Sequence, residues 1–92
     1  MLAVYEAPKL MGYHLKAIPK GEFGEISKIE EELAELKDAD YQGNRIMALV
    51  ELSDLIGSVQ GYLEKHYPGF GLKDLIKMAE ATSRAFTDGT RK

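Results

Sequence analysis

The stretch 45–66 has apolar residues on almost every side of the helix that its spacing predicts. One stripe repeats at intervals of three and four residues and consists of Leu49, Leu52, Ile56, Val59 and Leu63. Further apolar side chains, such as Ile46 and Val50, fall on the other faces. A helix that is apolar nearly all round is surrounded by partners, and a chain of 92 residues offers few. We therefore expect an all-α antiparallel bundle that is completed by oligomerisation, with this helix at the subunit interface.

Two more helices are predicted, one on each side of this stretch. The first spans about 24–39 and carries one apolar stripe, formed by Ile26, Ile29, Leu33 and Leu36. Gly43 is suited to end it, and Asn44 is suited to cap the helix that follows. The third helix spans about 72–87, with an inward face expected at Leu72, Leu75, Ile76, Ala79 and Phe86. The bundle therefore has about three main helices per chain.

The rest of the chain is predicted to be irregular, and residues 1–92 form a single domain. Prolines and glycines interrupt residues 1–21, which we interpret as an N-terminal cap ahead of a helical core at 24–87. Residues 88–92 are expected to be a frayed tail. No segment alternates with the period of two that a β-strand requires.

Composition excludes several classes of function. The chain has no cysteine, which excludes disulfides, thiolate metal sites and a cysteine nucleophile. Its net charge of −3 disfavours non-specific binding to nucleic acid. No secretory signal is visible, and no uninterrupted apolar run reaches the roughly 20 residues that span a bilayer. We expect a cytoplasmic protein that acts on neither nucleic acid nor membrane.

Acidic residues occur in pairs on the first two predicted helices. Glu32 and Glu35 are three residues apart on the first, and Glu51 and Asp54 are three apart on the second, so each pair shares a helix face. A short loop between the helices makes them antiparallel neighbours, which puts the two pairs at matched depth. Glu31 lies beside the first pair.

Four carboxylates that converge in this way suit Mg²⁺, which takes hard oxygen ligands in octahedral geometry and often also binds substrate phosphates. Mn²⁺ is a possible substitute. Zinc is less favoured, because the predicted cluster contains neither histidine nor cysteine. His14 and His66 are distant in sequence and are interpreted as surface or packing residues.

The run Glu31-Glu32-x-x-Glu35, followed after fifteen residues by Glu51-x-x-Asp54, resembles the EExxE…ExxD signature of the MazG-like all-α NTP pyrophosphohydrolases. The resemblance covers roughly residues 24–65. It implies Mg²⁺-dependent cleavage of a (d)NTP to (d)NMP and pyrophosphate by a homodimer or homotetramer. Carried over by position, Glu32, Glu35, Glu51 and Asp54 would be metal ligands. Glu31 would be a supporting group or the base that orients the attacking water.

Basic residues are the candidates for holding substrate phosphates. Arg84 and Lys77 occupy the region where many members of this family carry basic or amide residues, although an ordinary solvated helix face explains them as well. Lys28 is placed either to pair with Glu31 or Glu32 on its own helix or to reach phosphate.

Two alternatives remain open at this stage. Phosphoribosyl-ATP pyrophosphohydrolases have a similar Lys-x-x-Glu-Glu-x-x-Glu run, which begins here at Lys28, but usually continue after Asp-Leu with Tyr-His. Here Asp54-Leu55 is followed by Ile56-Gly57-Ser58, so this alternative ranks second. The other alternative is a non-catalytic helical dimerisation module that retains the acidic residues.

Overall fold

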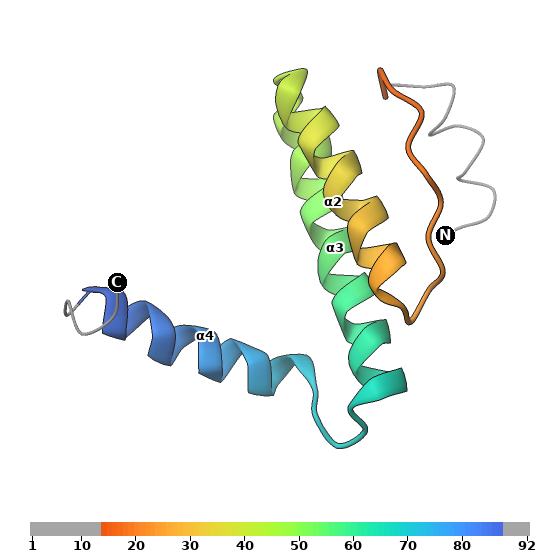
Figure 1. The fold of residues 1–92 in the computed structure, drawn as a ribbon. Coiled ribbons are helices and arrows are strands. Elements are labelled where there is room, and N and C mark those ends of the chain that lie inside the picture. Colours follow the sequence, from red (N-terminus) through yellow and green to blue (C-terminus); the bar gives the residue numbers. More distant parts are fainter. Residues whose placement is uncertain (1–13, 88–92) are drawn as a thin grey trace.

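The computed structural model of the chain describes residues 14–87 (Figure 1). The first thirteen residues of the expected cap and the expected tail at 88–92 lie outside the described residues. Within 14–87 the chain forms helices and no strand, which confirms the all-α prediction. The helices are α2 (Ile26–Tyr41), α3 (Arg45–His66) and α4 (Leu72–Thr87).

The helix boundaries follow local chemistry, and those of α3 and α4 match the predicted ranges. α2 begins and ends two residues later than predicted. Gly24 has a φ of 92°, a left-handed conformation that keeps it outside the helix, and Gly43 closes the far end with a φ of 72°. The Asn44 side chain accepts a hydrogen bond from the Met47 amide at 3.1 Å, which confirms its role as the N-cap of α3.

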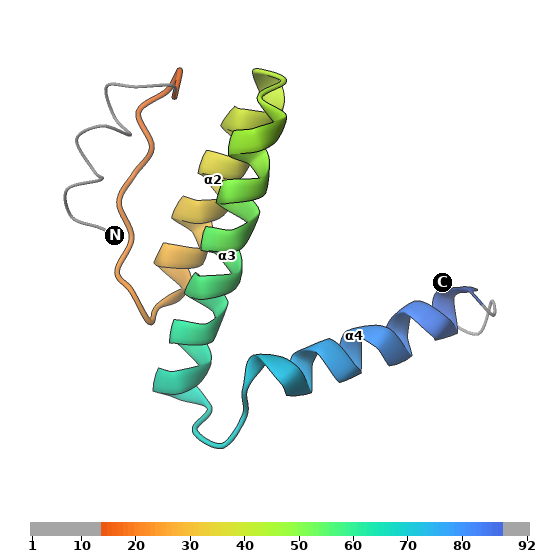
Figure 2. The same cartoon turned by 180° about the vertical axis from the view of Figure 1, so that it is seen from behind.

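Helices α2 and α3 form an antiparallel hairpin, and residues 14–25, here called the N-terminal strap, run alongside α2 (Figures 1 and 2). The strap is fixed at both ends. At the open end of the hairpin, Glu25 pairs with Lys65 and His66 of α3. At the other end, the Leu15 amide donates to Oδ2 of Asp38 on α2 at 3.0 Å. The strap therefore covers the length of α2 and brings its side chains to the hairpin.

Burial in the hairpin is inverted relative to an ordinary helix pair. The fully or nearly buried residues are mostly polar and include Glu31, Glu32, Glu35, Asp38, Glu51 and Ser58, whereas Ala39 and Leu63 are the buried hydrophobic residues among those described. Large apolar side chains such as Leu33, Leu49 and Ile56 are instead 45–67% exposed. The acidic stripes face each other inside the hairpin, and the apolar stripes, apart from the buried Leu63, are half-buried or exposed.

Helix α4 extends away from the hairpin (Figures 1 and 2). Among the described residues, α2 and α3 make the only extensive contact between helices. The predicted inward face of α4 is therefore wrong at two positions, because Ile76 is 56% exposed and Ala79 is also exposed. The physical reason is that, within residues 14–87, α4 makes no extensive contact with α2 or α3. The prediction also placed Phe86 inward, but the placement of its side chain lies outside the described part of the chain.

Helix α3 meets the minimum length and hydropathy of a membrane-spanning helix, with a mean hydropathy of 1.2 over its most apolar window. That window is 22% buried within the chain. Glu51 and Asp54 lie near the middle of this helix, where charged groups are costly in hydrocarbon. Their position against α2 accounts for the acids more simply than a bilayer does.

Candidate metal centre

Four carboxylates from the two helices of the hairpin meet at one place. They belong to Glu32 and Glu35 of α2 and to Glu51 and Asp54 of α3, and are here called the acidic cluster. One oxygen from each lies within 4.8 Å of the others. The three glutamates are buried, and Glu51 has no exposed surface at all. The convergence predicted from sequence spacing is therefore present in the fold.

Local sequence explains why the helices bring these groups together. The turn at Gly43 is short, so residues at equal distances from it face each other across the hairpin. Small residues are buried in the hairpin, namely Ala39 on α2 and Ser58 and Gly61 on α3, and Gly61 leaves room for the Phe23 ring of the strap. The Ser58 hydroxyl donates to the Leu55 carbonyl at 2.7 Å, which satisfies its polar group within α3.

Such an arrangement of like charges is costly without a compensating cation. Two unit charges about 4.8 Å apart repel by about 3.5 kcal/mol at an effective dielectric constant of about 20. Lys28 supplies one positive charge at the edge, since its Nζ lies 3.1 Å from Glu31 Oε1 and 3.2 Å from Glu32 Oε2. Lys28 therefore offsets part of this repulsion, and a divalent cation bound between the four carboxylates would offset more of it.

The contacts of Lys28 and Glu31 bear on the roles that the sequence left open for these two residues. Lys28 pairs with Glu31 and Glu32 of its own helix. Burial lowers the pKa of Lys28, but its bonds to Glu31 and Glu32 outweigh that effect and raise it. Glu31 Oε1 also accepts the Gly21 amide at 2.9 Å. Burial raises the pKa of Glu31, but the Gly21 and Lys28 hydrogen bonds outweigh it and hold that pKa below its usual range.

A histidine lies against the acidic cluster, which sequence spacing did not reveal. The His14 side chain is 2% exposed, with Nε2 at 3.7 Å from Glu51 Oε2 and 4.0 Å from Glu35 Oε1. The expectation that no histidine belongs to the cluster is therefore wrong. The reason is tertiary: the strap carries His14 back along α2 over 24 residues of sequence to Asp38. His66, in contrast, is exposed and bonds Glu25, as a surface residue does.

Asp38 is a second site residue that the sequence analysis did not single out. Its Oδ2 accepts hydrogen bonds from the Leu15 amide and from Gln42 Nε2, both at 3.0 Å, and lies 2.8 Å from His14 Nδ1. Burial raises the pKa of Asp38, but the His14, Leu15 and Gln42 hydrogen bonds outweigh it and hold that pKa below its ordinary value. Its spacing of three from Glu35 was the one available signal.

The donor set fits a divalent cation. The acidic cluster offers four carboxylates that can ligate with oxygen, the donor that Mg²⁺ and Mn²⁺ favour, and His14 adds an imidazole nitrogen beside Glu35 and Glu51. Glu32, Glu35, Glu51 and Asp54 would hold the ion, as the sequence predicts. The imidazole broadens the range of first-row metals that the site suits.

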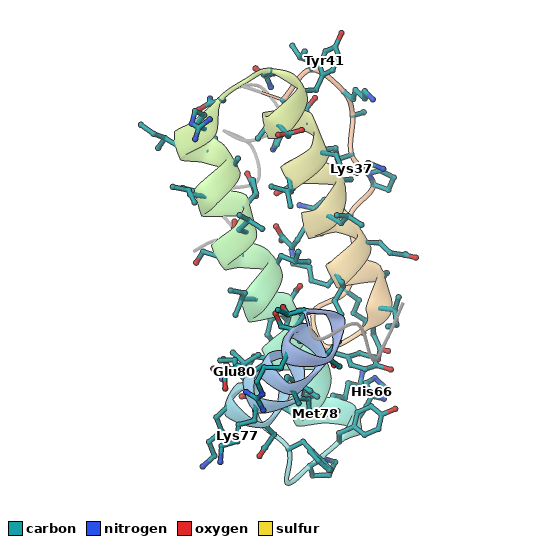
Figure 3. The ribbon with its side chains drawn as sticks, turned by 90° about the vertical axis from the view of Figure 1, so that its left-hand side faces the viewer. Lys37, Tyr41, His66, Lys77, Met78 and Glu80 are labelled. Carbon is teal, nitrogen blue, oxygen red and sulfur yellow. The ribbon has the colours of Figure 1, made fainter. Side chains whose placement is uncertain are left out.

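The other predicted phosphate-binding residues lie apart from the acidic cluster. Lys77 and Arg84 are exposed on α4, and Figure 3 shows Lys77 pointing outward from that helix. Because α4 extends away from the hairpin, one chain does not bring these two residues to its own carboxylates. Their role as substrate ligands stays a prediction.

A separate groove of about 460 Å³ lies between the strap and α2. Lys37 and Tyr41, both labelled in Figure 3, line its α2 side, and Lys16 and Ile18 line the strap side. None of the four residues of the acidic cluster lines this groove.

Comparison of the chain with protein-family models, with curated proteins and with solved structures finds no match. The case for a function therefore depends on the residues of the chain and on their geometry.

Proposed function

We propose that this chain is a Mg²⁺-dependent nucleoside triphosphate pyrophosphohydrolase, which cleaves a (d)NTP between its α- and β-phosphates to give (d)NMP and pyrophosphate. The observation that carries the proposal is the convergence of Glu32, Glu35, Glu51 and Asp54, from two helices, to within 4.8 Å. The motif that these residues form, EExxE…ExxD, supplies the reaction class by resemblance.

The chemistry of phosphoanhydride hydrolysis accounts for the acidic cluster. A divalent cation held there would neutralise phosphate oxygens and lower the pKa of a bound water. The carboxylates of the chain hold the ion and fix its position, and their burial keeps bulk water from competing for it. The same carboxylates repel a bare triphosphate, so binding of substrate depends on the ion.

In this proposal, Glu31 and Lys28 hold the strap and the acidic cluster in position. Glu31 joins the strap to α2 through the Gly21 amide, and Lys28 joins Glu31 to Glu32. Burial raises the pKa of Glu31, but the Gly21 and Lys28 hydrogen bonds outweigh it and lower that pKa, which makes Glu31 a weaker base toward the proton of an attacking water. These contacts favour a supporting role for Glu31 over the alternative of general base.

We further propose that the working form is a homo-oligomer. A compact monomer of 10.3 kDa exposes about 5,400 Å², whereas this chain exposes 6660 Å². Its radius of gyration is 15.3 Å, against about 12 Å for a compact domain of this length. A second copy that covers α4 and the apolar faces of α2 and α3 would remove this excess. It would also offer the α4 of one protomer, with Lys77 and Arg84, to the acidic cluster of its partner.

A pyrophosphate-release screen tests the proposed function. The full chain is incubated with each ribo- and deoxyribonucleoside triphosphate and with phosphoribosyl-ATP, with and without Mg²⁺. We expect Mg²⁺-dependent release from at least one triphosphate. Preference for phosphoribosyl-ATP would favour the alternative enzyme, and no release from any compound would favour the non-catalytic helical module.

A matched pair of variants ties any activity to the acidic cluster. Glu35→Gln removes one buried ligand, whereas Glu30→Gln makes the same chemical change at an exposed position of the same helix, on the side that faces the strap. We expect Glu35→Gln to lose at least a hundredfold in kcat/KM and Glu30→Gln to lose less than twofold. Near-normal turnover of Glu35→Gln with unchanged helix content would show that the site is wrongly assigned.

A further inference from the structure

The position of His14 is set by a carboxylate that the proposed reaction does not use. Its Nδ1 lies 2.8 Å from Oδ2 of Asp38, whose side chain is only 3% exposed. The same oxygen also accepts from Leu15 and Gln42, so Asp38 is itself fixed. The buried carboxylate of Asp38, with its three hydrogen-bond partners, therefore fixes the imidazole of His14 on its Nδ1 side.

This contact determines which nitrogen of His14 faces the acidic cluster. An ionised carboxylate only accepts hydrogen bonds, so the Nδ1 of His14 carries the proton in the contact with Asp38. In the neutral imidazole the lone pair is then on Nε2, the nitrogen directed at Glu35 and Glu51. A carboxylate behind an imidazole whose other nitrogen faces a cation is the usual support of a metal-binding histidine.

The distances around Nε2 are longer than hydrogen bonds and lie between those of adjacent and of opposite ligands of one ion. Nε2 lies 3.7 Å from Glu51 Oε2 and 4.0 Å from Glu35 Oε1, both longer than a hydrogen bond. Ligands about 2.1 Å from one ion are separated by roughly 3.0 Å when adjacent and roughly 4.2 Å when opposite. His14, Glu35 and Glu51 all offer ligand atoms within 4.8 Å of one another, so small adjustments bring them to one ion.

We propose that His14 Nε2 is a direct ligand of the divalent cation at Glu35 and Glu51, with Asp38 as the positioning residue that orients the imidazole. The proposal rests on the cation site of the proposed function and deepens it. A nitrogen ligand favours first-row transition cations over Mg²⁺, because Mg²⁺ prefers oxygen and imidazole suits the softer ions. The site therefore selects Mn²⁺ over Mg²⁺ more strongly than four carboxylates alone would.

The competing account makes His14 a positively charged counter-ion of the carboxylates. In that account a cation must displace or oppose the imidazolium, and removing His14 leaves Mn²⁺ binding unchanged or makes it tighter. If His14 is a ligand, its removal weakens Mn²⁺ binding. The two accounts thus predict opposite signs for the same measurement.

The test is pulsed electron paramagnetic resonance of the full chain loaded with Mn²⁺ alone, without nucleotide. We expect a ¹⁴N coupling to the Mn²⁺ spin that changes to a ¹⁵N coupling when the protein is grown with ¹⁵N-histidine. The coupling should persist in His66→Gln, which alters the other of the two histidines at an exposed position. Absence of nitrogen coupling in wild-type protein saturated with Mn²⁺ would overturn the proposal without any variant having to fold.

Binding constants supply the second readout. We expect His14→Gln to weaken the binding of Mn²⁺ at least tenfold and that of Mg²⁺ by less. Asp38→Asn should weaken the binding of Mn²⁺ by about 10- to 100-fold, because the His14 imidazole loses the group that orients it. Circular dichroism checks that helix content is kept. Unchanged or tighter Mn²⁺ binding in folded His14→Gln would overturn the proposal. Because no substrate is present, these results are independent of whether the chain hydrolyses nucleotides.

Discussion

Neutralising one carboxylate of the acidic cluster should stabilise the chain without metal and weaken its response to metal. Asp54→Asn keeps the shape of the side chain and removes one of four charges whose oxygens lie within 4.8 Å. Each close pair costs about 3.5 kcal/mol at an effective dielectric constant of about 20 when both groups are ionised. Proton uptake by the cluster limits the repulsion that remains, so we expect a gain of about 1–3 kcal/mol in the free energy of unfolding.

The stability difference between the variant and the wild type should shrink or vanish in Mg²⁺, because a cation that binds only the folded chain stabilises it. At a Mg²⁺ concentration a hundredfold above its Kd, binding adds about 2.7 kcal/mol to the free energy of unfolding of the wild-type chain. Asp54→Asn lacks one ligand of the cation, so Mg²⁺ should stabilise it much less than the wild-type chain. Wild-type protein should therefore be less stable than the variant in chelator, whereas saturating Mg²⁺ should remove most or all of that difference.

Urea denaturation followed by circular dichroism, at one fixed protein concentration, measures both effects. Asp40→Asn is the matched control, since it makes the same change at an exposed position near the end of α2. The free energy of unfolding of Asp40→Asn should differ from that of the wild type by less than about 0.5 kcal/mol, both in chelator and in Mg²⁺. The reasoning is refuted if Asp54→Asn is clearly less stable than wild type in chelator, or if Mg²⁺ stabilises both proteins equally.

Three other consequences are testable on the same material. Gly21→Ala should lower the free energy of unfolding by about 1–3 kcal/mol in thermal melts, because its Cβ would lie 2.2 Å from the Ser27 carbonyl oxygen. Gly57→Ala is the control: its Cβ would meet no atom within 4 Å, and the free energy of unfolding should rise by about 0.5–1 kcal/mol. Because the pKa of Asp38 is lowered in the folded chain, its stabilising effect is present above its ordinary pKa and lost as pH falls through the folded value. Asp38→Asn should therefore flatten the acid limb of the stability curve, and an unchanged limb would contradict this. Leu49→Glu, at a position 67% exposed, should reduce the sedimentation mass toward the 10.3 kDa of one chain, whereas an unaltered oligomer would place the interface elsewhere.

Much of the helical layout was predictable because it depends on local signals. Asn44 and the glycine before it determine the turn between α2 and α3, and the spacing of Glu32, Glu35, Glu51 and Asp54 then determines their meeting. These relations involve residues close in sequence or equally distant from one turn. They need no knowledge of the rest of the fold.

The features that could not be predicted are tertiary. Apolar periodicity indicates which residues share a face but not which face turns toward the neighbouring helix, and here the acidic faces meet. His14 reaches the acidic cluster through the path of the strap, which contains no periodic signal. The exposure of α4, at Ile76 for example, follows from its lack of extensive contact with the other described helices, and apolar periodicity does not record such contacts.

The central claim is that Glu32, Glu35, Glu51 and Asp54 hold one divalent-cation centre between α2 and α3. Anomalous diffraction from crystals grown in Mn²⁺, recorded at the manganese edge, tests it directly. The account predicts a strong anomalous peak within about 2.5 Å of carboxylate oxygens from both helices. Saturating Mn²⁺ that yields no peak between the helices, or a peak bound by residues elsewhere, would contradict the account.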